Sequence, residues 1–133
     1  MMTAAMVVDA GYPHHNTSHG NQDIFSMCVR WYMTKFQRML QALDVPDPLD
    51  PTGKTVLFNS VILLLAECLP VSHASNGVPC LIAGNGGGAL KGGRIINAAG
   101  ATNRSVLKTL LTTMGISTAT PQFDGPLIPE LRG

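Results

Sequence analysis

The residues best suited to chemistry in this sequence are its histidines, and they are gathered rather than scattered. Three of the four histidines lie in a stretch of six residues, 14–19, inside the polar segment 13–21: His14, His15 and His19. Such a cluster is unusual in a hydrophobic core, and neutral imidazole is the commonest side-chain ligand of divalent metals. A solvated polar loop would carry the same residues, so a metal site and a plain surface loop are both open interpretations at this point.

The fourth histidine follows a predicted strand. Residues 61–66 are apolar at every position and rich in branched side chains, which is typical of a strand covered on both faces. The run ends at Glu67, His73 follows in the same loop, and a second apolar run, 78–83, returns to the interior. Ligands bind at the carboxyl ends of strands in open α/β sheets. We therefore expect Glu67 and His73 at a ligand-binding edge.

These two sets of residues are able to form one site. If the loop before the first long helix lies beside the carboxyl end of the central strand, His15, His19, Glu67 and His73 converge as metal ligands. Three protein ligands and a water are the arrangement of a catalytic zinc, which lowers the pKa of its bound water to about 7. We therefore expect a divalent metal, zinc or manganese, as the cofactor.

A glycine-rich segment, 84–94, carries two cations, Lys91 and Arg94, that are candidates for binding an anionic substrate. The segment does not match the phosphate-binding pattern G-x-x-x-x-G-K-[ST], because Gly92 follows Lys91. A tight turn leading into an edge hairpin is the expected structure. The serines near the candidate ligands lie in no nucleophile motif such as G-x-S-x-G, so we do not expect a complete hydrolase from this chain alone.

Two helices are expected to frame these residues. Between 22 and 43, apolar residues recur at spacings of three and four and so share one helical face: Phe25, Val29, Tyr32, Phe36, Met39, Leu40 and Leu43. Asn21 is the expected N-cap. A second helix is expected at 104–114, capped by Asn103. With the apolar strands, this predicts an α/β fold, a small, mostly parallel sheet with a long helix and a C-terminal helix, followed by an extended tail at 116–133.

Length and composition limit the classes of protein to which this chain is able to belong. Its 133 residues suit a single domain with a core of its own. Charged residues make up 13%, against the usual ~25%, so part of the surface is expected to be covered by a partner or by further sequence. The net charge of +1 gives no electrostatic reason to expect nucleic acid. No apolar run reaches the roughly 18–20 residues that cross a bilayer, and the start lacks the basic and long apolar regions of a secretion signal.

The order of these motifs resembles a known family. His15-x-x-Ser18-His19, a long helix, a buried strand with an acidic end and a histidine shortly before Val78-Pro79 are similar to the HxxSHH family. These are bacterial proteins of unassigned function, often exported, whose arrangement is similar to that of the alkaline phosphatase/sulfatase superfamily. The resemblance covers nearly the whole chain.

The resemblance implies a metal-binding, hydrolase-like domain that acts on phosphate or sulfate esters. In the superfamily the corresponding positions bind two divalent metals, and His15, His19, Glu67 and His73 take those places here. Cys68 stands where the superfamily has a further histidine. The superfamily's nucleophile and its other metal-binding acid lie in an N-terminal half with no counterpart here, so the chain is expected to be the C-terminal portion of a larger fold.

Two functions of different classes remain open. The first is a metal-binding, hydrolase-like domain that is not catalytically complete alone. The second is a non-catalytic structural or assembly subunit that oligomerises through its apolar surface. A small sheet with an open edge favours a homo-oligomer or a partner chain that completes the sheet. The histidine pattern favours the first function, and the low charge and missing nucleophile favour the second.

Overall fold

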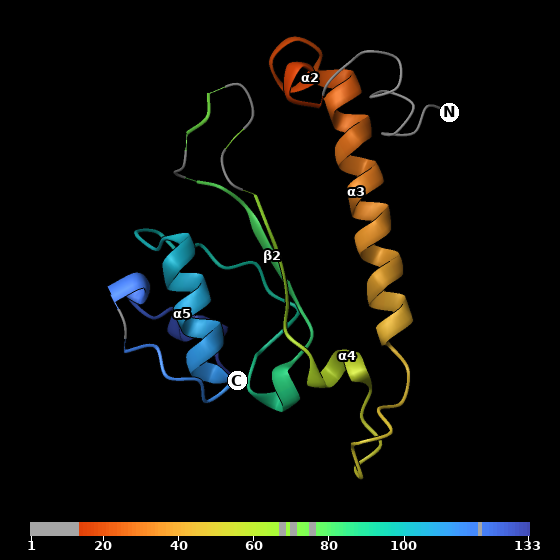
Figure 1. Ribbon diagram of the computed structural model, residues 1–133, viewed down its shortest axis with the longest axis vertical. Helices are drawn as coiled ribbons and strands as arrows, with labels where there is room; N and C mark the ends of the chain where they lie inside the picture. Colours follow the sequence, from red (N-terminus) through yellow and green to blue (C-terminus); the bar gives the residue numbers. More distant parts are fainter. Residues whose placement is uncertain (1–13, 67–68, 70–71, 75–76, 120) are drawn as a thin grey trace. The chain divides into compact units, whose positions relative to one another are not determined.

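The computed structural model describes residues 14–66, 69, 72–74, 77–119 and 121–133. They form two compact units: unit 1 within residues 14–42 and 64–81, and unit 2 within residues 43–63 and 82–133. The elements in chain order (Figure 1) are α2 (His14–Gly20), α3 (Gln22–Leu43), α4 (Val56–Asn59), β1 (Ile62–Leu65), β2 (Cys80–Ala83), the 3-10 turn η1 (Gly86–Gly88), α5 (Asn103–Thr113) and the 3-10 turns η2 (Pro121–Phe123) and η3 (Pro129–Leu131).

The long helix α3 has the bounds that the apolar spacing predicted. Its start is set by Asn21, whose side-chain oxygen accepts the backbone N–H of Ile24 at 3.0 Å. Cys28 is buried, and Ile24 and Trp31 pack against it, so the buried contacts of α3 gather in its first half. Neither α3 nor any other helix in the described part of the chain combines the length and the apolar character needed to cross a bilayer.

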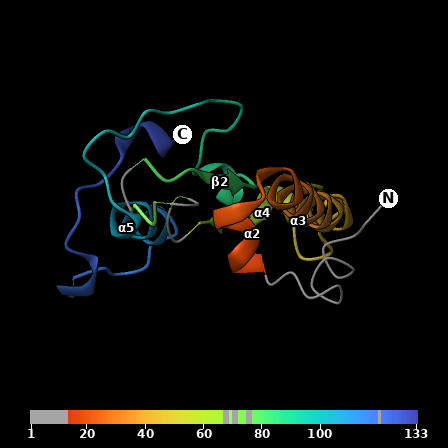
Figure 2. The same cartoon turned by 90° about the horizontal axis from the view of Figure 1, so that it is seen from above.

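The segment expected to be a loop before α3 is instead a short helix, α2. The N–H of Asn21 donates to the carbonyl of Thr17 at 3.1 Å, as in a continuous helix. The carbonyl of Ser18, however, accepts the side-chain amide of Gln22 at 3.0 Å. At this junction α2 turns away from the axis of α3 (Figures 1 and 2). Two candidate ligands therefore sit on a helix rather than on a loop.

The sheet is the part of the predicted fold that is wrong. The described residues contain a two-stranded antiparallel sheet, β1 beside β2, and not a small, mostly parallel one. All four residues of β1 are only partly buried, so its apolar run does not mark a strand covered on both faces. A parallel pair needs a crossover connection, usually a helix, whereas here the chain turns back after β1 and pairs with it directly. The carboxyl end of β1 therefore leads into a hairpin loop and not to the edge of a parallel sheet.

In unit 2, α5 begins one residue earlier than predicted. Thr102, rather than Asn103, is the N-cap, because Thr102 and Ser105 each accept the other's backbone N–H in a capping box. The buried apolar side chains of this unit come from α5, from the segment before it and from the C-terminal segment: Leu90, Val106, Leu110 and Ile128.

The C-terminal segment packs against α5. Ile128 is 5% exposed, and its N–H donates to Oγ1 of the fully buried Thr109 at 2.9 Å. Leu90 forms an isolated antiparallel bridge with Arg132. Where an edge hairpin was predicted after the glycine-rich turn, the chain therefore pairs with its own C-terminal segment.

Candidate metal centre

The helix α2 places two histidines on one face. His15 and His19 are four residues apart, and side chains at positions i and i+4 of an α-helix lie one above the other. Their ring centroids are 4.8 Å apart, with an edge-on angle of 61°. Both rings are exposed, so an ion in solvent has access to them.

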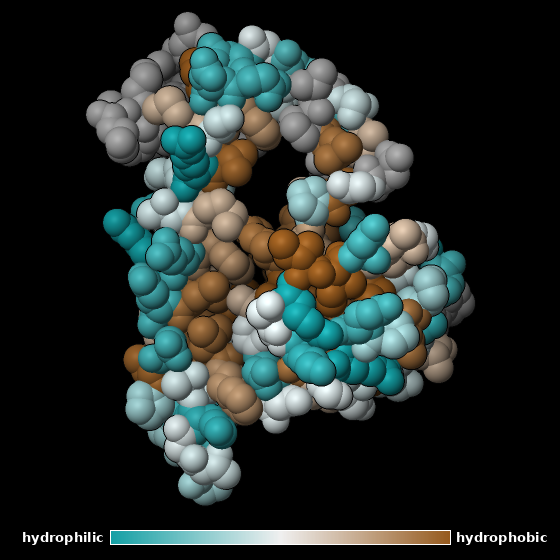
Figure 3. Space-filling model, turned by 180° about the vertical axis from the view of Figure 1, so that it is seen from behind, coloured by the Kyte–Doolittle hydropathy of each residue, from teal (hydrophilic) through white to brown (hydrophobic). Residues whose placement is uncertain are grey.

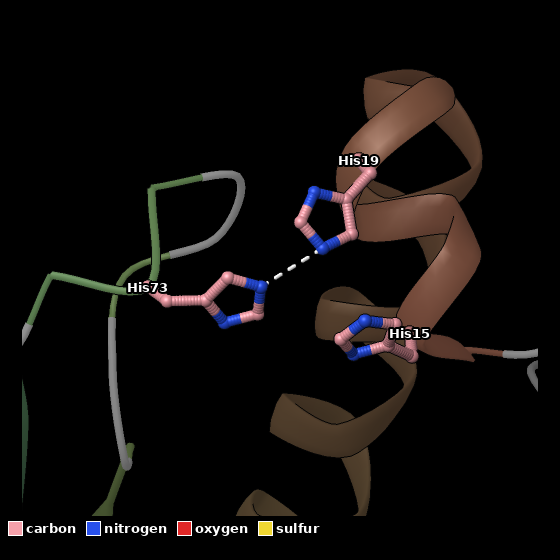
Figure 4. A group of neighbouring side chains, drawn as sticks. All are labelled: His15, His19 and His73. Atoms are coloured by element: carbon pink, nitrogen blue, oxygen red, sulfur yellow. Dashed lines mark hydrogen bonds between the residues drawn. The ribbon is translucent and has the colours of Figure 1, made fainter.

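His73 reaches the same place from the loop between β1 and β2. The N–H of Leu69 donates to the carbonyl of Ala74 at 2.8 Å, and the N–H of His73 donates to the carbonyl of Leu69 at 3.2 Å. The N–H of Ala74 also donates to Oγ of Ser72 at 3.3 Å. These bonds close a tight turn in which His73 has a φ of +53°, a region that residues other than glycine rarely adopt. From this turn the imidazole of His73 points toward α2 (Figure 4).

The three imidazoles converge (Figure 4). Nε2 of His73 lies 2.9 Å from Nε2 of His19. The rings of His15 and His73 are stacked, with centroids 5.4 Å apart and an angle of 20° between planes. One ligand nitrogen from each of the three rings lies within 4.8 Å of the other two. Two helical residues and one loop residue thus present their nitrogens to a common point.

The spacing is close to that of a metal site. Zinc–nitrogen bonds of about 2.0–2.1 Å in a tetrahedral site put neighbouring ligand nitrogens roughly 3.3 Å apart. The pair at 2.9 Å would open slightly and the widest pair would close by about 1.5 Å, which exposed rings achieve by small torsional changes. The bond between His19 and His73 requires one Nε2 to donate and the other to accept. An ion would bind both Nε2 atoms in place of this hydrogen bond, with the donating ring carrying its proton on Nδ1 instead.

The other predicted site residues are Glu67, Lys91 and Arg94. Glu67 is outside the residues that the structure describes. Lys91 and Arg94 belong to unit 2. Nε and Nη2 of Arg94 donate to the carbonyl of Lys91 at 3.3 and 3.1 Å, and Nη2 also donates to the carbonyl of Glu130. Arg94 thus helps to hold the C-terminal segment, and substrate binding by Lys91 and Arg94 stays a prediction.

The helix that carries the first two ligands was not predicted from the sequence. Two histidines at positions i and i+4 are the spacing by which one helical face binds a single ion, as in H-E-x-x-H. His15-x-x-x-His19 has this spacing. Gly20 and Asn21, which favour turns and caps, obscured the signal because they suggested a loop up to the start of α3.

Comparison of the chain with protein-family models, with curated proteins and with solved structures finds no match. The resemblance to the HxxSHH family stays a prediction.

Proposed function

We propose that this chain binds one divalent transition-metal ion through His15, His19 and His73. One observation carries the proposal: a ligand nitrogen of each ring lies within 4.8 Å of the other two, although His73 is 54 positions from His19 in the chain. The rings are exposed, so burial of apolar surface does not account for their convergence. A shared ion does account for it.

The donor set favours a metal of the zinc class. Imidazole nitrogen suits zinc, copper, nickel and iron, whereas magnesium, calcium and manganese prefer carboxylate, carbonyl and water oxygens. Of the two metals expected from the sequence, zinc is the better fit to three imidazoles. Manganese would call for a carboxylate, such as that of Glu67, in addition.

A zinc-class ion held in this way would support hydrolytic chemistry. Three protein ligands leave a coordination position for water, whose pKa falls to about 7 on zinc. The histidines would hold the ion at the surface, where a substrate is able to approach it. Hydrolysis of phosphate or sulfate esters is the reaction that the resemblance implies. We propose it as an activity of the complete fold, since a nucleophile and substrate-binding cations would be needed beside the ion.

Metal content after dialysis against zinc, measured by elemental analysis, tests the proposal. We expect about one zinc per chain for the wild type and for Asn16→Ala, a control that changes an exposed residue of α2. Structural zinc binding by four ligands is worth about 10–16 kcal/mol, so losing one ligand should cost roughly 3–4 kcal/mol, a 100- to 1000-fold loss of affinity.

His15→Ala, His19→Ala and His73→Ala should each show this loss, and manganese should bind more weakly than zinc. Wild-type affinity in His73→Ala would show that the three rings do not share an ion. Absence of zinc from the wild type would remove the proposal altogether.

A second candidate function, self-association through α3, is favoured by a separate observation. Four apolar side chains of α3 are each more than a third exposed: Val29, Tyr32, Met33 and Met39. Two of them, Val29 and Met33, also line a groove on α3, together with Arg30, Thr34, Phe36, Gln37 and Leu40. In Figure 3 apolar side chains run along one side of this helix and polar ones cover the other.

The spacing of apolar residues along α3 suits a second copy of the same helix. Phe25, Val29, Tyr32, Phe36, Met39 and Leu43 follow one another at alternating steps of four and three, which is the seam of a coiled coil. Sedimentation equilibrium would give a dimer for the wild type and a monomer for Val29→Lys, with Gln41→Lys, at an exposed position outside both the seam and the groove, as a control. A monomeric wild type at high micromolar concentration would exclude this function.

A further inference from the structure

The three histidines join two segments of unit 1 that are far apart in the chain. His15 and His19 lie on α2, and His73 lies 54 positions beyond His19, in the turn that includes Leu69 and Ala74. Since α2 leads into α3 and the turn belongs to the β1–β2 loop, an ion shared by the rings would tie a helical segment to a hairpin loop.

Few buried apolar contacts are available among the described residues to make the same connection. Among the described residues of unit 1 the buried apolar side chain is Cys28, and its packing partners Ile24 and Trp31 lie on the same helix. Unit 2 buries apolar side chains from three different segments of its chain: Leu90, Val106, Leu110 and Ile128. Unit 2 therefore has a core that connects its elements, whereas α2 and the hairpin loop share no buried apolar side chain among the described residues.

The backbone conformation of His73 supports the same inference. Its φ of +53° is in the left-handed region, which glycine adopts far more readily than a residue with a side chain. The turn around it is closed by bonds from Leu69 to Ala74 and from His73 to Leu69. An unfavourable backbone conformation persists only when its surroundings hold it in place, and the His73 side chain contacts both histidines of α2.

We propose that the ion acts as a clasp: its binding orders the turn around His73 against α2, while unit 2 keeps its fold without metal. The proposal rests on the metal binding proposed above and adds that the metal controls the conformation of one unit alone. Because a preformed site rarely exists in an unfolded segment, metal-binding free energy becomes ordering free energy for that segment. The chain would then respond to metal by docking His73 against α2 and releasing it.

Hydrogen exchange of the full chain, measured by mass spectrometry with and without zinc, tests the clasp. At free zinc 100 times the dissociation constant, an ion that binds the closed form alone suppresses opening about 100-fold. Residual binding by the helical pair His15 and His19 would lower this figure. We expect amides of α2 and of Leu69, His73 and Ala74 to exchange about 10 to 100 times more slowly with zinc, and amides of α5 to be unchanged.

Two variants separate the clasp from its alternatives. His73→Asn keeps a residue that tolerates the left-handed backbone but removes the imidazole, so zinc should no longer slow exchange of the turn. Asn16→Ala changes an exposed residue of α2 and should respond to zinc as the wild type does.

Elemental analysis of the same samples distinguishes the two proposals. Zinc bound at one per chain with no slowing at the turn would overturn the clasp and leave metal binding intact. Equal slowing in α5 would overturn the claim that one unit alone responds. No bound zinc would overturn both proposals.

Discussion

Replacing Thr109 by valine should release the C-terminal segment from α5. The Thr109 side chain is fully buried. Its Oγ1 donates to the carbonyl of Ser105 at 2.7 Å and accepts the N–H of Ile128 at 2.9 Å. Valine keeps the shape and removes the hydroxyl. The carbonyl of Ser105 retains its helical N–H partner, whereas the N–H of Ile128, a residue 5% exposed, loses its acceptor.

The expected decrease in the free energy of unfolding follows from the unpaired N–H group of Ile128. A buried donor left without a partner costs about 1–3 kcal/mol. For a unit of fewer than 100 residues, each kcal/mol lowers the midpoint of thermal unfolding by roughly 4–8 °C. The same 1–3 kcal/mol corresponds to about a 5- to 150-fold faster exchange of the Ile128 amide, if that amide exchanges by opening of the segment.

Thr113→Val is the matched control. Oγ1 of Thr113 donates to the carbonyl of Thr109 at 2.7 Å, so this variant also removes a threonine hydroxyl from α5, but it orphans no N–H group. Its effect should stay within about 0.5 kcal/mol. Thermal unfolding by circular dichroism and exchange at Ile128 are the two measurements. Equal effects of the two variants on both would show that the bond from Ile128 to Thr109 does not hold the segment.

Three further outcomes are expected. Gly84→Ala should destabilise unit 2 by about 2–5 kcal/mol in urea titrations, because Gly84 has a φ of +85° and an added Cβ would overlap the carbonyl oxygen of Ser60. Gly53→Ala is the control: Gly53 has a φ of +75° but open space around it, so this variant should cost only about 1–2 kcal/mol. Thr102→Ala should lower stability by about 1 kcal/mol through loss of the α5 cap, and serine at this position should restore it. Burial raises the pKa of the Cys80 thiol, so iodoacetamide at pH 8 should alkylate Cys80 more slowly in the folded than in the urea-unfolded chain. The Cys80 thiol ionises at a lower pH in the unfolded chain than in the folded chain. Its contribution to the free energy of unfolding is therefore fully present below about pH 8.5 and is lost as the pH rises through the pKa of the folded state.

The helices could be predicted because their signals are local. Apolar residues spaced by three and four, with Asn21 as a cap, placed α3 with correct bounds. The same reasoning placed α5 within one residue, since Thr102 and Asn103 are both good caps and the side chain of Ser105 decides between them. The helix α2 was missed because it has only seven residues and no apolar periodicity.

The sheet could not be predicted in the same way. An apolar run such as 61–66 is compatible with a strand covered on both faces and with a half-buried hairpin strand. The path of the chain after this run decides which of the two strand types is formed, and that path is set by tertiary contacts. The direct return of β2 beside β1 made the sheet antiparallel.

By itself the sequence determined the long helix, the capped helix α5 and the identity of the histidines able to hold a metal. The meeting of His15 and His19 with His73 was decided only by the tertiary structure, because side chains 54 positions apart share no local periodicity. Helical spacing aligned the first pair, and the turn closed by the bonds of Leu69 with His73 and Ala74 brought the third ring to them. The sequence gives the type of each candidate ligand, but the distances between ligands on remote segments are set by how the whole chain packs.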